Sequence, residues 1–148
     1  MFPGVHLEYG TAAAIARWTS QGKHIAYCLA TSGEAGIDAI EPERCRPLRE
    51  QEERDSAAVV GVESVEFLGH PDGMLEYGLP LRRDVARAVR RCRPEVVITG
   101  YFGESWAPGG LNQPTTSQSG AASSMGYAMP ATAGCFANCS TRASNRAP

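Results

Sequence analysis

A strand–loop–helix–strand pattern in the middle of the chain constrains the fold more than any other feature. Residues 62–68 are typical of a strand, and the turn-forming loop 69–73 follows them. Apolar residues then recur at helical spacing over 79–92, with arginines between them. Pro94 ends that predicted helix, and the apolar segment 96–98 is typical of a buried strand. The pattern predicts one parallel βαβ unit with a right-handed crossover.

Ligand sites in open parallel sheets lie beyond the carboxyl ends of the strands. In this unit those ends are the segments 69–73 and 100–110. The second segment contains a Gly109–Gly110 pair, and Gly-rich flexibility suits a loop that shapes a pocket. We therefore look for binding residues in these two segments.

The first sixty residues continue the same alternation. Residues 9–21 predict an alanine-rich helix that Thr11 would cap, and residues 24–30 predict a strand. After the small-residue loop 31–36 and a charged segment, residues 48–60 predict a second helix. The whole order predicts an α/β fold, a Rossmann-like parallel sheet with flanking helices whose first strand is missing.

The missing strand has a consequence for stability. In a doubly wound sheet the first strand lies in the middle, so its loss exposes backbone edges on two neighbours. Native proteins have margins of only about 5–15 kcal/mol. We therefore expect the isolated chain to aggregate or to be largely unfolded.

The composition divides the chain into two parts. Residues 1–113 form a partial domain, whereas residues 114–148 lack Asp, Glu and Lys and show no lasting period, so we expect a disordered tail. We hypothesise that the tail is out of frame. If residues 114–121 are written in GC-rich codons and one base is added in front, the new reading frame encodes Ala-Asp-His-Ile-Ala-Val-Gly-Arg. This sequence contains potential metal ligands.

Charge and hydropathy exclude some classes of function. The formal net charge of −2 gives no reason to expect a nucleic-acid partner. No apolar run approaches the ~18 residues that a membrane span needs, and no signal peptide is evident at residue 1. The five cysteines, odd in number and scattered, favour reduced thiols and a cytoplasmic protein over disulfides or a zinc site.

Four motifs occur in order along the chain, namely residues 31–36, Arg49 with Glu52, residues 68–73 and residues 93–99. Together they resemble the LmbE-like (PIG-L type) deacetylases, and the resemblance covers roughly residues 7–113. The resemblance implies a zinc-dependent hydrolase that removes acetyl groups from N-acetylglucosamine-containing substrates. In an intact member, Glu104, Trp106 and the Gly109–Gly110 pair would line the mouth of the site. Zinc-activated water would attack the amide carbonyl, with a carboxylate as general base.

The family's metal ligands are two histidines and an aspartate, and this chain departs from that set. Alignment on residues 8–10 places Pro3 at the first histidine, Val5 at the aspartate and His6 at the base. The last histidine position falls on Thr116. No ligand position is kept, so we expect no metal-binding and no catalytic residue in the chain as written. Zinc belongs to the family and not to this chain.

The substrate side of the family's site is better preserved. The resemblance implies that Arg49 and Asp72, with Gly73 in the same loop, bind a small N-acetylated sugar. The alternatives are an ordinary turn for Asp72 and a surface pair with Glu52 for Arg49. His70 is expected to be a satisfied loop histidine rather than a ligand.

Two functional interpretations remain open. The first is membership of the metal-dependent deacetylase family, with amide hydrolysis as the reaction. The second is a catalytically inactive remnant that is at most a sugar-binding module. A basic patch for phosphate or an acidic partner is a further alternative for the arginines of 79–93, which are most simply a solvated helix face.

Overall fold

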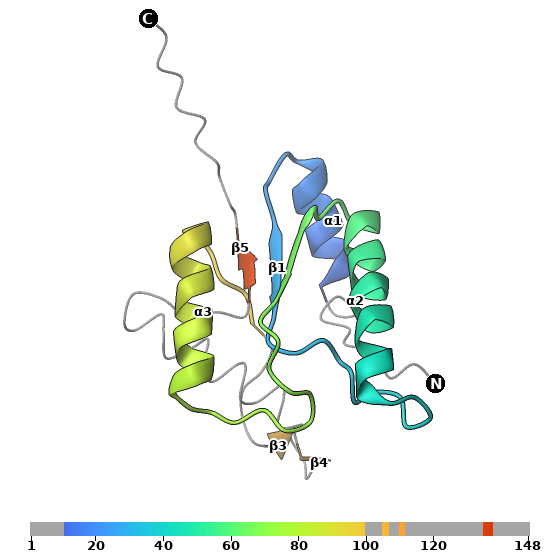
Figure 1. The fold of residues 1–148 in the computed structure, drawn as a ribbon. Helices are drawn as coiled ribbons and strands as arrows, with labels where there is room; N and C mark the ends of the chain where they lie inside the picture. The colour runs from blue at the N-terminus through green and yellow to red at the C-terminus, as the bar shows by residue number, and fades with distance from the viewer. Residues whose placement is uncertain (1–10, 100–104, 107–109, 112–134, 138–148) are drawn as a thin grey trace, which may run out of the picture.

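The computed structural model describes residues 11–99, 105–106, 110–111 and 135–137 (Figure 1). The helices are α1 (Ala12–Ser20), α2 (Pro42–Val59) and α3 (Leu79–Cys92). The strands are β1 (Ala26–Leu29), β2 (Ser64–Phe67), β3 (Ser105–Trp106), β4 (Gly110–Leu111) and β5 (Cys135–Ala137). The predicted α/β class is confirmed. The predicted domain boundary at residue 113 and most of the predicted tail lie outside the described residues.

A sheet with the order β2-β1-β5 forms the centre of the molecule. β1 pairs in parallel with β2, from Ala26 opposite Ser64 to Leu29 opposite Phe67, so β1, α2 and β2 form a parallel βαβ unit. On its other edge β1 pairs antiparallel with β5, a strand that the sequence did not predict. All four residues of β1 are buried, as expected for a strand with neighbours on both edges.

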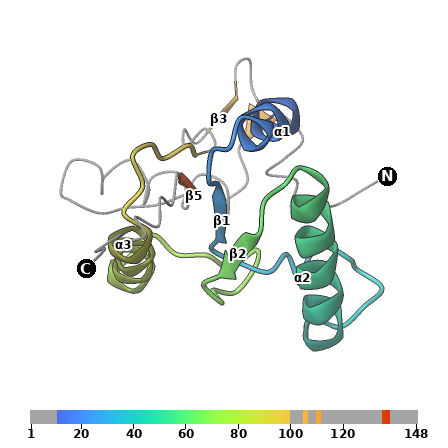
Figure 2. The same cartoon turned by 90° about the horizontal axis from the view of Figure 1, so that it is seen from above.

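Helices cover both faces of this sheet (Figure 2), and each face has its own core. Side chains alternate along a strand, so Tyr27 and Leu29 of β1 point to one face and Cys28 points to the other. Tyr27 and Leu29 pack with Ile15 of α1 and Ala57 of α2. Cys28 packs on the opposite face with α3.

The helix α3 follows the sequence prediction residue for residue. Its buried side chains are Leu81, Val85 and Ala88, the period on which the prediction rested. The helix ends at Arg93, which has left-handed backbone angles, directly before Pro94.

The predicted strand over residues 96–98 is wrong. These residues form no strand, and the side chain of Val96 is exposed. In a doubly wound sheet this segment would pair with the first strand of the fold, and the described residues contain no strand before α1. No strand of the described part of the chain therefore lies in position to pair with this segment, although Ile98 packs against the core around Tyr27.

The helix α2 begins six residues before the predicted start at residue 48. Pro42 occupies the first turn, where the backbone N–H that proline lacks would have no partner within the helix. Cys45, also in this early part of the helix, is fully buried. Pro47 lies inside the helix, where it removes one backbone hydrogen bond. We attribute the early start to the burial of Cys45, a tertiary contact that the charged segment does not reveal.

The helix α1 begins later than predicted and is attached to α2 by its last turn. Thr11 occupies the N-cap position, but its side chain makes no capping hydrogen bond, contrary to the prediction. At the other end, the Thr19 hydroxyl donates a 2.6 Å hydrogen bond to the carbonyl of Val60. The neighbouring Gly61 has φ +79°, and a Cβ placed there would lie 2.9 Å from Thr19 Oγ1.

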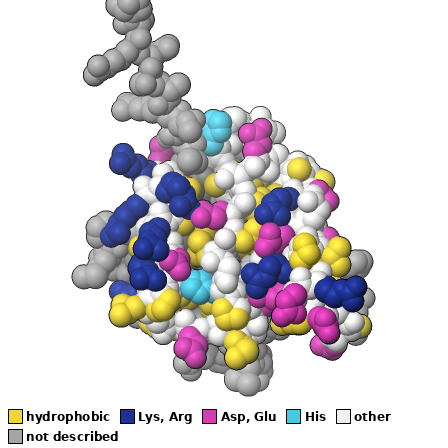
Figure 3. Space-filling view, viewed as in Figure 1, with side chains coloured by type: hydrophobic (Ala, Val, Ile, Leu, Met, Phe, Trp, Pro, Cys, Tyr) yellow, Lys and Arg dark blue, Asp and Glu magenta, His cyan; other side chains and the backbone are white. Residues whose placement is uncertain are grey.

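The arginines of α3 form a solvated face, as expected (Figure 3). Arg87 pairs with Asp84 on the same helix, and Arg91 pairs with Glu66 of β2. Glu66 raises the pKa of the Arg91 guanidinium above its ordinary value, first through their hydrogen bond and then through its charge. Among the helices that the structure describes, none is both long and apolar enough to cross a bilayer.

Candidate functional site

Two loops meet where the parallel strands end. Hydrogen bonds continue past the strand pair, from Leu68 N to Leu29 O (2.8 Å) and from His70 N to Ala30 O (2.9 Å). The loop after β1 (residues 31–36) and the loop after β2 (residues 69–73) therefore start side by side. This is the edge at which an α/β sheet binds ligands, and it contains Asp72 and Gly73.

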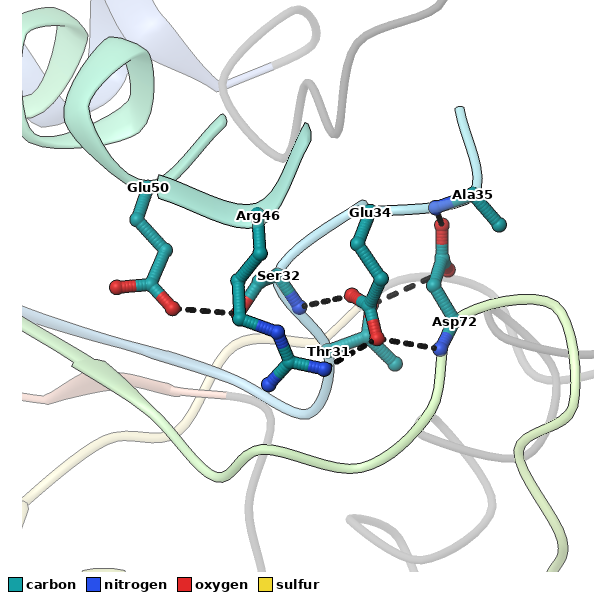
Figure 4. A network of polar contacts seen from close by, with 7 residues as sticks. All are labelled: Thr31, Ser32, Glu34, Ala35, Arg46, Glu50 and Asp72. Carbon is teal, nitrogen blue, oxygen red and sulfur yellow. Dashed lines mark hydrogen bonds and ion pairs between the residues drawn. The ribbon is translucent and has the colours of Figure 1, made fainter. Parts of the chain in front are cut away.

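Glu34 joins these loops to helix α2. Its carboxylate is buried, with the residue 4 % exposed. Oε1 accepts hydrogen bonds from Arg46 Nη2 at 2.9 Å and from the backbone N–H of Asp72 at 3.2 Å. Oε2 accepts from the backbone N–H of Ser32 at 3.1 Å. One carboxylate thus links three parts of the chain (Figure 4).

The side chain of Asp72, in the second loop, forms hydrogen bonds to the first loop. Its Oδ1 accepts a hydrogen bond from the Thr31 hydroxyl at 3.2 Å, and its Oδ2 accepts from the Ala35 N–H at 3.3 Å. Gly73 follows with φ +72°, a left-handed conformation that suits glycine. Asp72 is therefore more than an ordinary turn residue, because its side chain joins the two loops.

A second contact ties the first loop to α2. The Ser32 hydroxyl donates to Glu50 Oε1 at 2.8 Å, and Glu50 Oε2 accepts from Arg54 Nη2 at 3.1 Å. Ser32 is buried and Glu50 is half-buried. The first half of α2 thus contacts the first loop through Arg46 and Glu50.

Arg49 belongs to the same part of α2 but makes none of the hydrogen bonds described above. Its ion pair is with Glu52, one helical turn away, which is the surface-pair alternative. The side chain is nevertheless only 12 % exposed. Its buried Nε has no hydrogen-bond partner among the described residues. The structure therefore brings Asp72 and Gly73 together and places Arg49 on the adjacent helix.

His70 lies beside the neighbouring helix α3. Its Nε2 is 3.4 Å from Asp84 Oδ2, and the side chain is 16 % exposed. This buried nitrogen makes no hydrogen bond with the described residues. The prediction of a hydrogen-bonded loop histidine is therefore not confirmed.

The described side chains do not fit a family-type metal centre. Among them, no group of three or more His, Cys, Asp or Glu residues is arranged to hold a metal ion. The carboxylates of Glu34 and Asp72 accept hydrogen bonds from backbone N–H groups, an arginine and the Thr31 hydroxyl. Pro3, Val5, His6 and Thr116, the positions that correspond to the family's ligands and base, lie outside the described residues.

The predicted mouth of the site is described only in part. Trp106 and Gly110 pair in the antiparallel β3–β4 sheet, which Figure 1 draws at the lower end of the molecule, toward which β1 runs. Glu104 and Gly109 lie outside the described residues.

The sequence prediction missed the residues that connect the site. Arg46 and Glu50 were not singled out, and Thr31 and Glu34 entered the prediction only as members of the motif 31–36. The available signal for Glu34 was its position, since it is a charged residue among small residues directly after a buried strand. Arg46 gave no signal, because the start of α2 was placed after it.

Comparison with known sequences assigns the chain to one family. The model of the family described as PIG-L, GlcNAc-PI de-N-acetylase, matches residues 7–108. A diacetylchitobiose deacetylase of Thermococcus kodakarensis is 27 % identical over 101 residues, which are 67 % of this chain and 37 % of the relative.

Two solved structures share the fold. The N,N'-diacetylchitobiose deacetylase of Pyrococcus horikoshii, solved with an inhibitor, matches with a TM-score of 0.72 at 23 % identity. That match covers 80 % of this chain and 44 % of the other. A conserved protein of Thermus thermophilus matches with a TM-score of 0.61 at 26 % identity, covering 76 % and 46 %. The chain spans less than half the length of each of these three proteins.

Proposed function

The chain belongs to the PIG-L family of GlcNAc-PI de-N-acetylases, and on this premise we propose that it binds a small N-acetylated amino sugar. The two deacetylases named above act on diacetylchitobiose, as their names state, which supports this substrate class. We assign binding to Asp72, Gly73 and Arg49.

The observation that carries the proposal is the fixed position of Asp72. Hydrogen bonds from Thr31 and Ala35 hold its carboxylate at the carboxyl ends of β1 and β2. A carboxylate has about four acceptor positions, so it can also accept hydrogen bonds from sugar hydroxyls. Arg49 of helix α2 is the second residue that we assign to the ligand, because its buried Nε has no hydrogen-bond partner among the described residues.

Deacetylation is the reaction of the family, and it requires an activated water at the amide carbonyl. Zinc would supply that activation in an intact member. The described residues do not fit a zinc site, so we assign no step of hydrolysis to them. The sequence favours a second candidate, a chain that binds the sugar without hydrolysing it, because the positions aligned with the family's ligands carry Pro3, Val5 and Thr116. We place either candidate in the cytoplasm, a proposal that rests on the odd number and scattered spacing of the five cysteines.

The test is a titration of the full chain with N-acetylglucosamine and N,N'-diacetylchitobiose, followed by protein NMR. Asp72→Asn is expected to raise Kd about 10- to 100-fold, because hydrogen bonds to charged groups contribute ~1.5–3 kcal/mol. Asp55→Asn is the matched control, since Asp55 lies exposed on α2 and pairs with Gln51. Absence of sugar binding by the unmodified chain would refute the proposal.

An assay of acetate release separates the two candidates. The reaction is run with added Zn²⁺ and, in parallel, with a chelator. Zinc-dependent acetate release would establish the deacetylase. Sugar binding without acetate release, unchanged by either addition, is the result expected of the binding module.

A further inference from the structure

We propose that Glu34 is the positioning residue of the sugar site, with Arg46 as its partner. Glu34 would set the orientation of Asp72 and so determine the affinity for the sugar without touching it. This inference rests on the proposed function. Through Arg46 and Asp72, Glu34 would connect its own loop, residues 31–36, to helix α2 and to the second loop.

The first step of the argument is the set of groups around the Glu34 carboxylate. Its three described partners are all donors, namely Arg46 Nη2, the Ser32 N–H and the Asp72 N–H. A carboxylate can satisfy donors on both oxygens, whereas an amide presents an NH₂ group to one side. Glu34→Gln would therefore place a donor against a donor in a buried site, where an unmade hydrogen bond is costly.

The second step is the route from Glu34 to Asp72. Glu34 accepts from the backbone N–H of Asp72, and the Asp72 carboxylate in turn accepts from the N–H of Ala35, the residue after Glu34. These reciprocal bonds, 3.2 Å and 3.3 Å long, close a ring between the two loops (Figure 4). Loss of the Glu34 half of the ring frees the backbone at Asp72 and, with it, the direction of its side chain.

The third step is the contribution of α2. Glu34 is 5 % exposed in its side chain, so its charge requires a partner, and Arg46 supplies one at 2.9 Å. The Arg46 side chain is 42 % exposed, which leaves the pair open to solvent on one side. Helix α2 thus fixes the loops through an arginine at its beginning.

A double-mutant cycle tests whether Glu34 acts through Asp72. We measure the Kd of N-acetylglucosamine by NMR titration for the unmodified chain, E34Q, D72N and E34Q/D72N. E34Q alone is expected to raise Kd at least tenfold. In the D72N background the same change is expected to raise Kd less than twofold, because the group that it orients is already lost. A purely structural role of Glu34 would give equal fold-changes in both backgrounds and would overturn the inference.

Hydrogen exchange separates failure of this inference from failure of the proposed function. Without any sugar, E34Q is expected to speed exchange of the Asp72 and Ala35 amides at least tenfold, with Asp55→Asn unchanged. Unchanged exchange in E34Q would refute the positioning role even if the sugar binds. Faster exchange in a chain that binds no sugar would refute only the proposed function.

A variant at Arg46 covers the case in which E34Q does not fold. Arg46→Gln removes the charge partner but leaves the two backbone hydrogen bonds of Glu34 in place. It is expected to raise Kd severalfold in the Asp72 background and to leave D72N unaffected. Equal effects in the two backgrounds would again contradict the proposal.

Discussion

Two glycines of the described chain show how a single residue's surroundings decide its importance. Gly22 ends α1 with φ +76°, and Gly61 follows α2 with φ +79°. A Cβ at Gly22 would meet nothing within 4 Å, whereas one at Gly61 would lie 2.9 Å from Thr19 Oγ1. The two positions share a backbone conformation and differ in the space beside them.

Alanine substitution at both sites separates these effects. Gly22→Ala is expected to cost about 1–2 kcal/mol, the penalty for a left-handed L-residue. Gly61→Ala is expected to cost about 1–3 kcal/mol more, because it also displaces the Thr19 side chain that hydrogen-bonds Val60. Chemical denaturation of both variants provides the measurement. Equal losses of unfolding free energy would show that Thr19 moves aside freely.

The site depends on residues whose roles differ in how visible they are in the sequence. Asp72 was predicted because it belongs to a family motif in a turn after a strand, and the structure places it in the network between the loops. Arg46 was not predicted, since it lies twelve residues from Glu34 and meets it only through the packing of α2. Sequence spacing cannot reveal a hydrogen bond between separate elements.

Among the elements, α3 was predicted best because one face of it is buried and the other is charged. Leu81, Val85 and Ala88 recur every three or four residues and pack with Cys28 and Leu75. This alternation is a property of the helix itself and survives in any context that covers the apolar face. The early part of α2 has no such period, which explains the wrong start.

A pair of leucines in α3 tests this account. Leu81→Ala is expected to destabilise the chain by ~2–5 kcal/mol, because Leu81 is 1 % exposed and its loss leaves a cavity. Leu79→Ala, two residues earlier, is expected to change stability by less than ~0.5 kcal/mol, because Leu79 is 77 % exposed. Thermal and urea unfolding would measure both. Similar losses for the two variants would contradict the observed orientation of α3.

At the scale of the whole molecule, the decisive feature is what covers β1. The sequence predicts that a missing first strand leaves edges unpaired. In the structure, β5 pairs with Ala26–Cys28 and occupies the edge of β1 opposite β2. The expectation of an aggregation-prone chain remains a prediction, and it now depends on whether β5 keeps this place in solution.

Two truncations address that dependence. Removal of residues 130–148 eliminates β5 and is expected to lower the temperature at which light scattering rises, because it uncovers a backbone edge. Removal of residues 140–148 leaves β5 in place and is the control. The same onset in both truncated chains would show that β5 does not protect the edge.

The sequence by itself determined the α/β class, the family, the extent of α3 and the loop of Asp72 and Gly73. These features depend on local patterns, namely hydrophobic period, turn residues and short motifs. Only the tertiary structure decided the start of α2, the absence of a strand at 96–98, the pairing of β5 and the Glu34–Arg46 contact. Each of these depends on a partner distant in the sequence, and a buried surface, a hydrogen-bond ladder or an ion pair forms only when folding brings that partner near.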